Sequence, residues 1–399
     1  IEHLTTDQEV RGSNPFGRKP ADAPAPPGGG VSLVSAAHIA RVAPGMWHFC
    51  IVSTATVEPS GETSTAPPRG NVAVLVVVAL LVVAPIVALD LSPWSANGSL
   101  WYLGMLPALM GLFTSRRLAL GAAALTPAIV GVSLLLRDMP AVVGAGYMMV
   151  LGAVTGLVAV RGWHVMFAFA APLAALALIG DLHVAMPSGR VDADSSPAAM
   201  LVTLAVLLLG GVWTACLGPF ALRRMHVTAP EPVSARAAGF FAVSLGGMVA
   251  VGSFIALTWL PPTSWWMILT FYVVVQPHFA EMVTRVGHRV VGTLVGSTLA
   301  AVVVYYFRHL PGLIGALAAA LTLLAAWANL RLPYWVFVTF LTPAVVLQTS
   351  GGTRDLAKAI ADRAGYTLIG AAAALILMTC GHQYLVWHAA RAARDRTGP

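Results

Sequence analysis

Three basic side chains at helical spacing are the most suggestive chemistry in this chain. Arg285, His288 and Arg289 lie between two long apolar runs, and their separations of three and four residues place them on one helix face. Guanidinium groups bind carboxylates through paired hydrogen bonds, so this face could trap an organic anion at the mouth of a membrane pathway. The alternative is that the three are ordinary positive charges that fix membrane topology.

The pattern around these residues recurs later in the chain. Residues 289–296 and 363–370 both read Arg-x3-Thr-Leu-[Val/Ile]-Gly, and residues 266–271 and 335–340 both read Trp-x3-Thr-Phe. We interpret the two segments as copies of one three-helix unit. Copies offset by three membrane spans cross the bilayer in opposite senses, so the pattern predicts an inverted-topology repeat, which is common in transporters.

The repeat extends the candidate site to the second copy. Arg363 matches Arg289, and Thr367 matches Thr293. Arg363 falls on the predicted outer side, where topology alone does not favour an arginine. We therefore expect a substrate pathway between the two copies, with Arg289 and Arg363 near opposite faces of the membrane. The threonines suit either substrate contact or packing.

The dipeptide Gln276-Pro277 predicts a break in the first copy. Proline removes a backbone donor, so we expect the helix to end there and a polar, basic turn to follow as far as Arg285. The freed carbonyls and the Gln276 amide could line a pathway, or the break could be an ordinary helix end at the interface. His278 and Glu281 could relay a proton or be solvated loop residues.

Small and aromatic residues surround these groups. Gly292, Gly296 and Gly370 are expected to allow close helix packing, because small residues let helix backbones approach in a membrane. The nearby aromatic residues would anchor helices at the membrane interface or stack on an aromatic substrate. They are Trp265, Trp266, Tyr272, Trp335 and Phe340.

The composition sets the class of protein. Hydrophobic residues make up 58% of the 399 and charged residues 10%, whereas soluble proteins carry about 25% charged residues. A chain this apolar needs the bilayer as its solvent, and its long Ala-, Leu- and Val-rich runs lack the alternation of barrel strands. We predict an all-α polytopic membrane protein.

Runs long enough to cross a bilayer predict about twelve transmembrane helices in two six-helix halves, each made of two three-helix units. The halves are 71–221 and 238–387, joined by a cytoplasmic connector at 222–237. The predicted spans are 71–89, 99–114, 118–136, 140–160, 163–180, 198–221, 238–260, 265–280, 288–307, 311–330, 333–349 and 364–387.

The basic residues predict the orientation. With the N-terminus inside, 17 of the 23 Lys and Arg fall in cytoplasmic segments and 6 fall outside, as the positive-inside rule requires. Both termini are then cytoplasmic, including a basic tail at 388–399. The net charge of +7 is explained in this way and does not indicate nucleic-acid binding.

Residues 1–70 differ from the rest of the chain. They are polar and rich in Pro and Gly, which predicts a disordered cytoplasmic tail. Residues 12–15 read Gly-Ser-Asn-Pro, the in-frame translation of the T-arm of a bacterial tRNA gene. We therefore expect the first part of this tail to be an over-extended reading of the gene, with translation beginning near Met46.

Motifs for catalysis, metals and nucleotides are missing from the sequence. It has no His-x3-His pair, nucleophile elbow or phosphate-binding loop, and Cys50, Cys216 and Cys380 are too far apart to suggest a disulfide framework or a metal site. We predict no enzyme activity and no cofactor. By the predicted boundaries, no charged residue lies deep in a span.

Residues 265–300 and 334–372 resemble the fusaric acid resistance protein-like (FUSC) superfamily, which includes aromatic acid exporters and is related to plant aluminium-activated malate channels. The resemblance implies an integral membrane protein that moves organic anions outward. The short connector departs from exporters that carry a large soluble domain. The resemblance rests on Trp266, Thr270, Gln276-Pro277, Arg285, Arg289, Gly292-Thr293, Gly296, Trp335, Thr342-Pro343, Arg363, Thr367 and Gly370.

The sequence thus predicts a transporter that exports small organic or aromatic carboxylic acids. Its expected partners are the lipid bilayer, small organic anions and a second copy of itself. Two alternatives stay open at this point. One is an anion channel of the malate-channel type, and the other is a non-transporting membrane scaffold or envelope biogenesis factor.

Overall fold

The computed structural model describes residues 97–222, 230–277, 279–307, 309, 311–349 and 356–396, with six further residues between 84 and 94. The tail predicted at 1–70 lies outside these residues. So do most of the predicted first span at 71–89 and residues 223–229 of the connector predicted at 222–237.

The first half of the described chain consists of helices joined by short connections and one β-hairpin. Its elements are α2 (Gly98–Leu112), α3 (Arg116–Leu136), α4 (Ala141–Leu157), the 3-10 turn η2 (Val158–Arg161), α5 (His164–Ile179), β1 (His183–Met186), β2 (Gly189–Asp192) and α6 (Pro197–Leu222).

The second half is entirely helical where it is described. Its elements are α7 (Ala235–Trp259), the 3-10 turn η3 (Pro262–Ser264), α8 (Trp265–Val274), α9 (Phe279–Phe307), α10 (Pro311–Arg331), α11 (Tyr334–Thr349) and α12 (Leu356–Arg396). The predicted spans from 99–114 to 364–387 each correspond to one helix, in order from α2 to α12.

Six of the described helices are long and apolar enough to cross a membrane, and three shorter ones are also apolar. The chain is therefore an all-α, multi-pass membrane protein. The six are Arg116–Leu136, Ala141–Arg161, Pro197–Phe220, Ala235–Trp259, Met282–Phe307 and Ile360–Gly381.

Helix boundaries follow local chemistry. The Ser115 hydroxyl accepts a hydrogen bond of 3.1 Å from the backbone N–H of Leu118 and so caps the start of α3. Ser234 caps α7 in the same way through Ala237. Between α4 and α5 the chain turns at Gly162, whose φ of 72° lies in the left-handed region that favours glycine.

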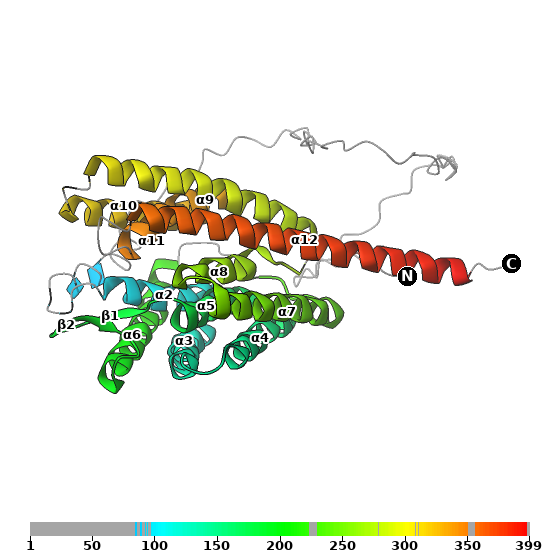
Figure 1. Cartoon of the computed structure of the whole chain (residues 1–399), viewed down its shortest axis with the longest axis horizontal. Coiled ribbons are helices and arrows are strands. Elements are labelled where there is room, and N and C mark those ends of the chain that lie inside the picture. The colour runs from blue at the N-terminus through cyan, green and yellow to red at the C-terminus, as the bar shows by residue number, and fades with distance from the viewer. Residues whose placement is uncertain are drawn as a thin grey trace, which may run out of the picture. The chain divides into compact units, whose positions relative to one another are not determined.

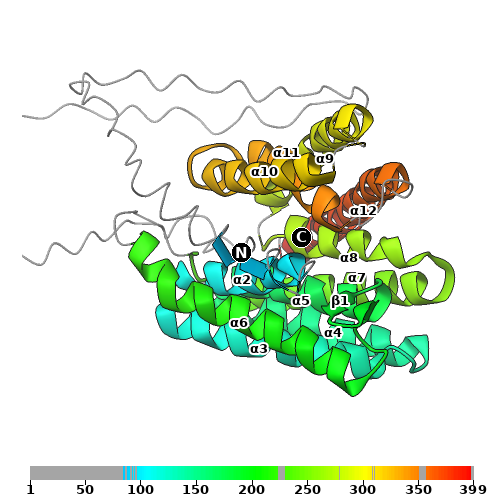
Figure 2. The ribbon, with the colours of Figure 1, turned by 90° about the vertical axis from the view of Figure 1, so that its left-hand side faces the viewer.

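The helices form two layers whose helices do not all run in one direction, because α12 is seen lengthwise in Figure 1 and α3 and α6 are seen lengthwise in Figure 2. Helices α2 to α7 make one layer, α9 to α12 lie above it in Figure 1, and α8 lies between them. The first layer is held together by close backbone contacts, because a Cβ on Gly152 would lie 2.9 Å from the Cα of Gly246. This pairing of small residues on α4 and α7 is the usual way for membrane helices to approach each other.

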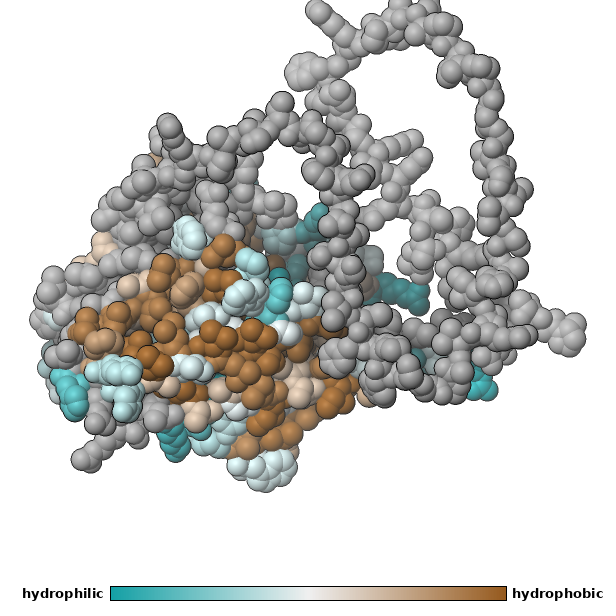
Figure 3. Space-filling view, turned by 90° about the horizontal axis from the view of Figure 1, so that it is seen from above, coloured by the Kyte–Doolittle hydropathy of each residue, from teal (hydrophilic) through white to brown (hydrophobic). Residues whose placement is uncertain are grey.

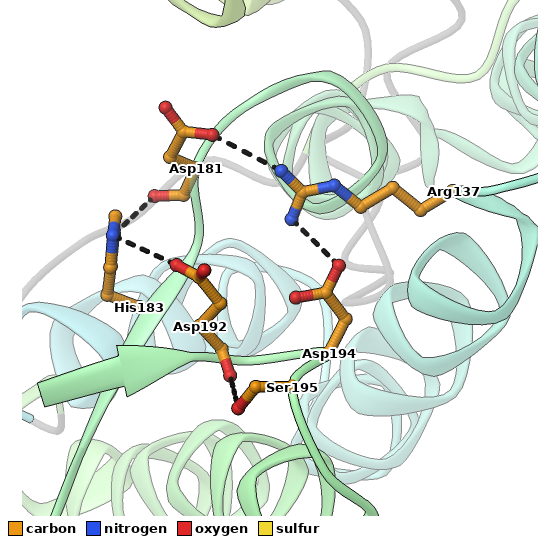
Figure 4. Close-up of polar contacts among 6 residues, drawn as sticks. All are labelled: Arg137, Asp181, His183, Asp192, Asp194 and Ser195. Atoms are coloured by element: carbon orange, nitrogen blue, oxygen red, sulfur yellow. Dashed lines mark hydrogen bonds and ion pairs between the residues drawn. The ribbon is translucent and has the colours of Figure 1, made fainter.

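A polar cluster closes one end of the first layer (Figure 4). Arg137, just after α3, forms ion pairs of 3.2 Å with both Asp181 and Asp194, which flank the β-hairpin. The imidazole of His183 lies 3.1 Å from a carboxylate oxygen of Asp192. Because Arg137 and the hairpin meet, the end of α3 and the α5–α6 connection lie at the same end of the layer, as the sequence-based topology requires.

The visible surface fits a lipid environment. Figure 3 shows a broad hydrophobic area with hydrophilic residues toward its margins. Large apolar side chains are exposed on α9 and α12, among them Val295, Tyr305, Leu368 and Ile376. Side chains of this kind are stable when exposed to hydrocarbon and unfavourable when exposed to water.

The segment after Gln276 differs from the expectation. A polar turn was predicted as far as Arg285, but α9 already begins at Phe279. The interruption between α8 and α9 is therefore short. Helix α9 extends toward it because a helix satisfies its own backbone groups, and its polar first turns need no separate loop to accommodate them.

Candidate functional site

Two buried arginines stand at the centre of the second half of the chain. Arg289 on α9 is 2% exposed and Arg363 on α12 is 1% exposed, and both lie within candidate membrane spans. Arg289 is the eighth residue of the span Met282–Phe307, and Arg363 is the fourth of the span Ile360–Gly381. Arg363 falls inside a span because α12 begins at Leu356, eight residues before the predicted start at 364. That no charged residue lies deep in a span stays a prediction.

Arg363 is stacked on an aromatic ring. Its guanidinium carbon lies 4.0 Å from the centre of the Trp266 ring on α8, and Trp265 lies against Trp266 with ring centres 3.8 Å apart. A cation over an indole face is attracted by the ring quadrupole, and the attraction is strongest away from water. The contact holds the planar guanidinium in one orientation, with Nε and Nη1 buried and without a hydrogen-bond partner.

Arg289 lies where α9 packs closely against α11. A Cβ on Gly292 would come within 2.5 Å of the Trp335 carbonyl oxygen, and one on Gly296 within 2.6 Å of the Thr339 carbonyl oxygen. Both glycines are therefore needed for this approach of the two backbones. The Nε of Arg289 is buried and has no hydrogen-bond partner.

The packing of α12 on α8 has the same character. A Cβ on Gly370 would lie 3.1 Å from the Met267 carbonyl oxygen and 3.0 Å from the Thr270 Cβ. Thr270 donates to the carbonyl oxygen of Trp266 at 2.8 Å, and Thr339 on α11 donates to that of Trp335 at 2.9 Å. Each arginine-bearing helix thus packs, through a glycine, against a helix that carries a Trp-x3-Thr turn.

Hydroxyl groups without partners lie on the same helices. Elsewhere in the described chain, buried threonines such as Thr126 and Thr203 donate to the carbonyl four residues earlier. Thr293 and Thr367 are equally buried, yet their hydroxyls make no hydrogen bond. Further buried hydroxyls without partners belong to Ser264, Tyr272, Ser297 and Thr342.

Helices α9 and α12, which carry the two arginines, pack against each other. Both arginine side chains are almost fully buried within the protein. Their predicted placement near opposite faces of the membrane stays a prediction.

No carboxylate balances these charges in the described part of the chain. The ion pairs found there involve Arg137 and His183, at the hairpin end of the first layer. Burying an unpaired charge in a membrane is costly, and such groups mark ion or substrate pathways. The buried guanidinium donors without partners make Arg289 and Arg363 candidates for binding an anion.

Other predicted site residues have different roles. The Gln276 amide is buried and donates to the carbonyl oxygens of Val273, at 3.2 Å, and Val275, at 3.0 Å. It thereby satisfies backbone groups freed at the end of α8, so its donors are not presented to a pathway as predicted. Pro277 is half-buried beside it. His278 and the side chain of Glu281 lie outside the described residues.

Arg285 and His288 are more exposed than Arg289 and Arg363. Both are half-buried, and the guanidinium carbon of Arg285 lies 5.4 Å from the centre of the Tyr334 ring on α11. Arg285 therefore sits one turn from Arg289 toward the start of α9, where it could guide an anion toward the buried pair.

The comparisons with known proteins agree with this placement. Residues 249–377 match the model of the fusaric acid resistance protein-like family, and this segment contains both arginines. Residues 249–377 form a fusaric acid resistance protein-like domain. The recognition made from residues 265–300 and 334–372 is thus confirmed. No solved structure matches the chain.

One curated relative also matches part of the chain. An uncharacterized protein of Synechocystis sp. is 32% identical over 136 residues, which are 33% of this chain and 17% of that protein. The chain therefore spans less than a fifth of that relative in the matched region. The apolar helices make this a multi-pass membrane protein.

Sequence reasoning missed Ser297 and Thr342. Ser297 lies four residues after Thr293 and so on the same helix face, and its hydroxyl faces the interior without a partner. That spacing was visible in the sequence and could have added it to the site. Thr342 precedes Pro343 in the resemblance motif, but its role beside Gly296 depends on the packing of α9 on α11.

Proposed function

We propose that the protein transports small organic or aromatic carboxylates across the membrane, and that the anion binds between Arg289 and Arg363. The observation that carries this proposal is the pair of buried guanidinium groups on two helices that pack together, α9 and α12, without a carboxylate partner in the described chain. A carboxylate offers the planar pair of acceptors that a guanidinium fits best. It also supplies the missing negative charge.

The proposed architecture is twelve transmembrane helices with inverted repeats. Helix α9 packs on α11, and α12 packs on α8. In both pairs a glycine of the arginine helix meets a backbone carbonyl of the Trp-x3-Thr helix. These matched contacts support two copies of one unit that exchange partners across a pseudo-two-fold axis, with the substrate site at their interface.

Further parts of the proposal concern location and direction. We place the protein in a bacterial inner membrane with both termini in the cytoplasm, exporting its substrate, and we propose that copies associate as a homo-oligomer. The excess of Lys and Arg in cytoplasmic segments supports the orientation. We propose no enzyme activity.

Transport by the purified protein tests the proposal. Liposomes containing the full chain should take up radiolabelled benzoate or malate, and Arg289→Gln or Arg363→Gln should abolish the uptake. Arg289→Lys keeps the charge but loses the paired donors, and should retain only part of the activity. Arg116→Gln is the matched control, because Arg116 is exposed at the start of α3.

Two results would contradict the proposal. One is uptake that persists at the wild-type rate in both Gln variants. The other is the absence of uptake of every acid in a panel of aromatic and aliphatic carboxylates by folded wild-type protein. Currents far above the turnover of a carrier would instead identify the protein as an anion channel.

A further inference from the structure

Asp362, the residue before Arg363 on α12, is bonded to a segment far away in the sequence. The Thr263 hydroxyl, in the 3-10 turn η3, donates to a carboxylate oxygen of Asp362 at 2.9 Å, and the two residues are 99 positions apart. Both side chains are half-buried. Among the side chains that the structure describes within helices α2 to α12, Asp362 has the only carboxylate. Because η3 leads directly into α8, the hydrogen bond joins α12 to the start of α8.

This hydrogen bond lies beside the contact between Arg363 and Trp266. Trp266 follows Thr263 by three residues, and Arg363 follows Asp362 by one, so the same two segments meet at two points. Neighbouring residues of an α-helix project about 100° apart, so Asp362 and Arg363 leave α12 in different directions. Two contacts in different directions fix the rotation of α12 about its own axis, which the stack on Trp266 alone would leave less restricted.

We propose that Thr263 and Asp362 are positioning residues of the anion site. Their hydrogen bond sets the rotation of α12 and so holds the Arg363 guanidinium over Trp266. The inference rests on the proposed function, because it assumes an anion bound between Arg289 and Arg363. A guanidinium binds a carboxylate through two parallel hydrogen bonds in one plane, so a small rotation of α12 misaligns both of them. Neither Thr263 nor Asp362 needs to touch the anion.

A role of Asp362 through its charge would have the opposite sign. A carboxylate near an anion site repels the anion, so removing that charge would tighten anion binding. Removing a positioning hydrogen bond weakens anion binding instead. Asparagine at this position separates the two roles, because its amide oxygen can still accept from the Thr263 hydroxyl although the charge is gone.

Calorimetric titration of the full chain with benzoate tests the positioning role. Asp362→Ala and Thr263→Val should each raise the Kd about three- to tenfold, the range that the net effect of one hydrogen bond supplies. The double variant should raise the Kd no further, because both changes remove the same contact. Asp362→Asn and Thr263→Ser keep an acceptor and a donor, so they should bind benzoate nearly as the wild type does. In liposomes, Thr263→Val should raise the KM for benzoate with little change in the maximal rate.

Thr258→Val and Asp138→Ala are matched controls. The Thr258 hydroxyl donates to the Phe254 carbonyl oxygen at 2.7 Å within α7, and Asp138 is exposed after the end of α3. Both variants should keep the wild-type Kd for benzoate. Asp362→Asn decides between position and charge even where Asp362→Ala does not fold, because only a role through charge lowers its Kd.

Two outcomes overturn the positioning role and leave the proposed function standing. One is a wild-type Kd in both Asp362→Ala and Thr263→Val, while Arg289→Gln and Arg363→Gln do not bind benzoate. The other is a lower Kd in both Asp362→Asn and Asp362→Ala, which would show that Asp362 acts by repulsion. If the arginine variants also bind as the wild type does, the proposed function is overturned and the positioning role with it.

Discussion

The guanidinium group of Arg363 lies over the indole ring of Trp266, with 4.0 Å between the guanidinium carbon and the ring centre. The contact joins α12 to α8, two helices that are far apart in the sequence. It replaces part of the hydration that a buried arginine loses, without supplying a negative charge. The donors of the guanidinium edge therefore stay available to an anion, and the stack keeps them in place.

Removing the indole ring of Trp266 should both weaken anion binding and lower the stability of the protein. Trp266→Leu takes away a desolvated cation–π contact worth about 2 kcal/mol, and Arg363 should then lose its fixed orientation. We expect the Kd for benzoate to rise at least tenfold and the thermal midpoint to fall. Trp259→Leu serves as the control, because Trp259 is exposed at the end of α7; an equal effect of both changes would contradict the role of Trp266.

The glycines of α9 should differ sharply in their tolerance of a methyl group. Gly296→Ala would force a Cβ to within 2.6 Å of the Thr339 carbonyl oxygen, so α9 and α11 must separate. We expect a lower thermal midpoint and loss of uptake. Gly287→Ala, also in α9, meets no atom within 4 Å. It should be neutral or slightly stabilising, because alanine favours a helix by about 1 kcal/mol over glycine. Matching losses in both variants would refute this explanation.

The hydroxyls without partners should matter for binding more than for stability. Thr293→Val and Thr367→Val keep the side-chain shape and remove groups that make no hydrogen bond in the described structure. We expect both to raise the Kd for benzoate several-fold while the thermal midpoint stays the same or rises. Thr126→Val removes a hydrogen bond of 2.8 Å to the Ala122 carbonyl, so it should lower the midpoint and leave the Kd unchanged. The opposite pattern would show that Thr293 and Thr367 only pack.

Cysteine labelling can test the orientation of the first half. In a background with Cys50, Cys216 and Cys380 replaced by alanine, Asp138→Cys and Ser188→Cys should react with an impermeant reagent from the same side, because Arg137 pairs with both ends of the hairpin. Glu231→Cys lies beyond the opposite end of α6 and should react from the other side, which we expect to be the cytoplasm. Labelling of all three positions from one side would overturn the topology.

Several features followed from the sequence because their causes are local. Long apolar runs predict membrane helices since every backbone group in a bilayer must be satisfied within its own segment. The helices from α2 to α12 accordingly lie where the runs of the sequence placed them. The motif Arg-x3-Thr-Leu-[Val/Ile]-Gly drew attention to Arg289 and Arg363 through spacing alone, and the same motif supported the family recognition.

The tertiary structure decided what those residues do. Hydropathy assigns a residue only to a depth along its own helix, so it could not show that Arg289 and Arg363 would both be buried on helices that pack together. Sequence spacing could not show that Gln276 would satisfy the carbonyls at the end of α8. Contacts between distant helices depend on how small residues such as Gly296 and Gly370 let their backbones approach, and that complementarity exists only in the folded chain.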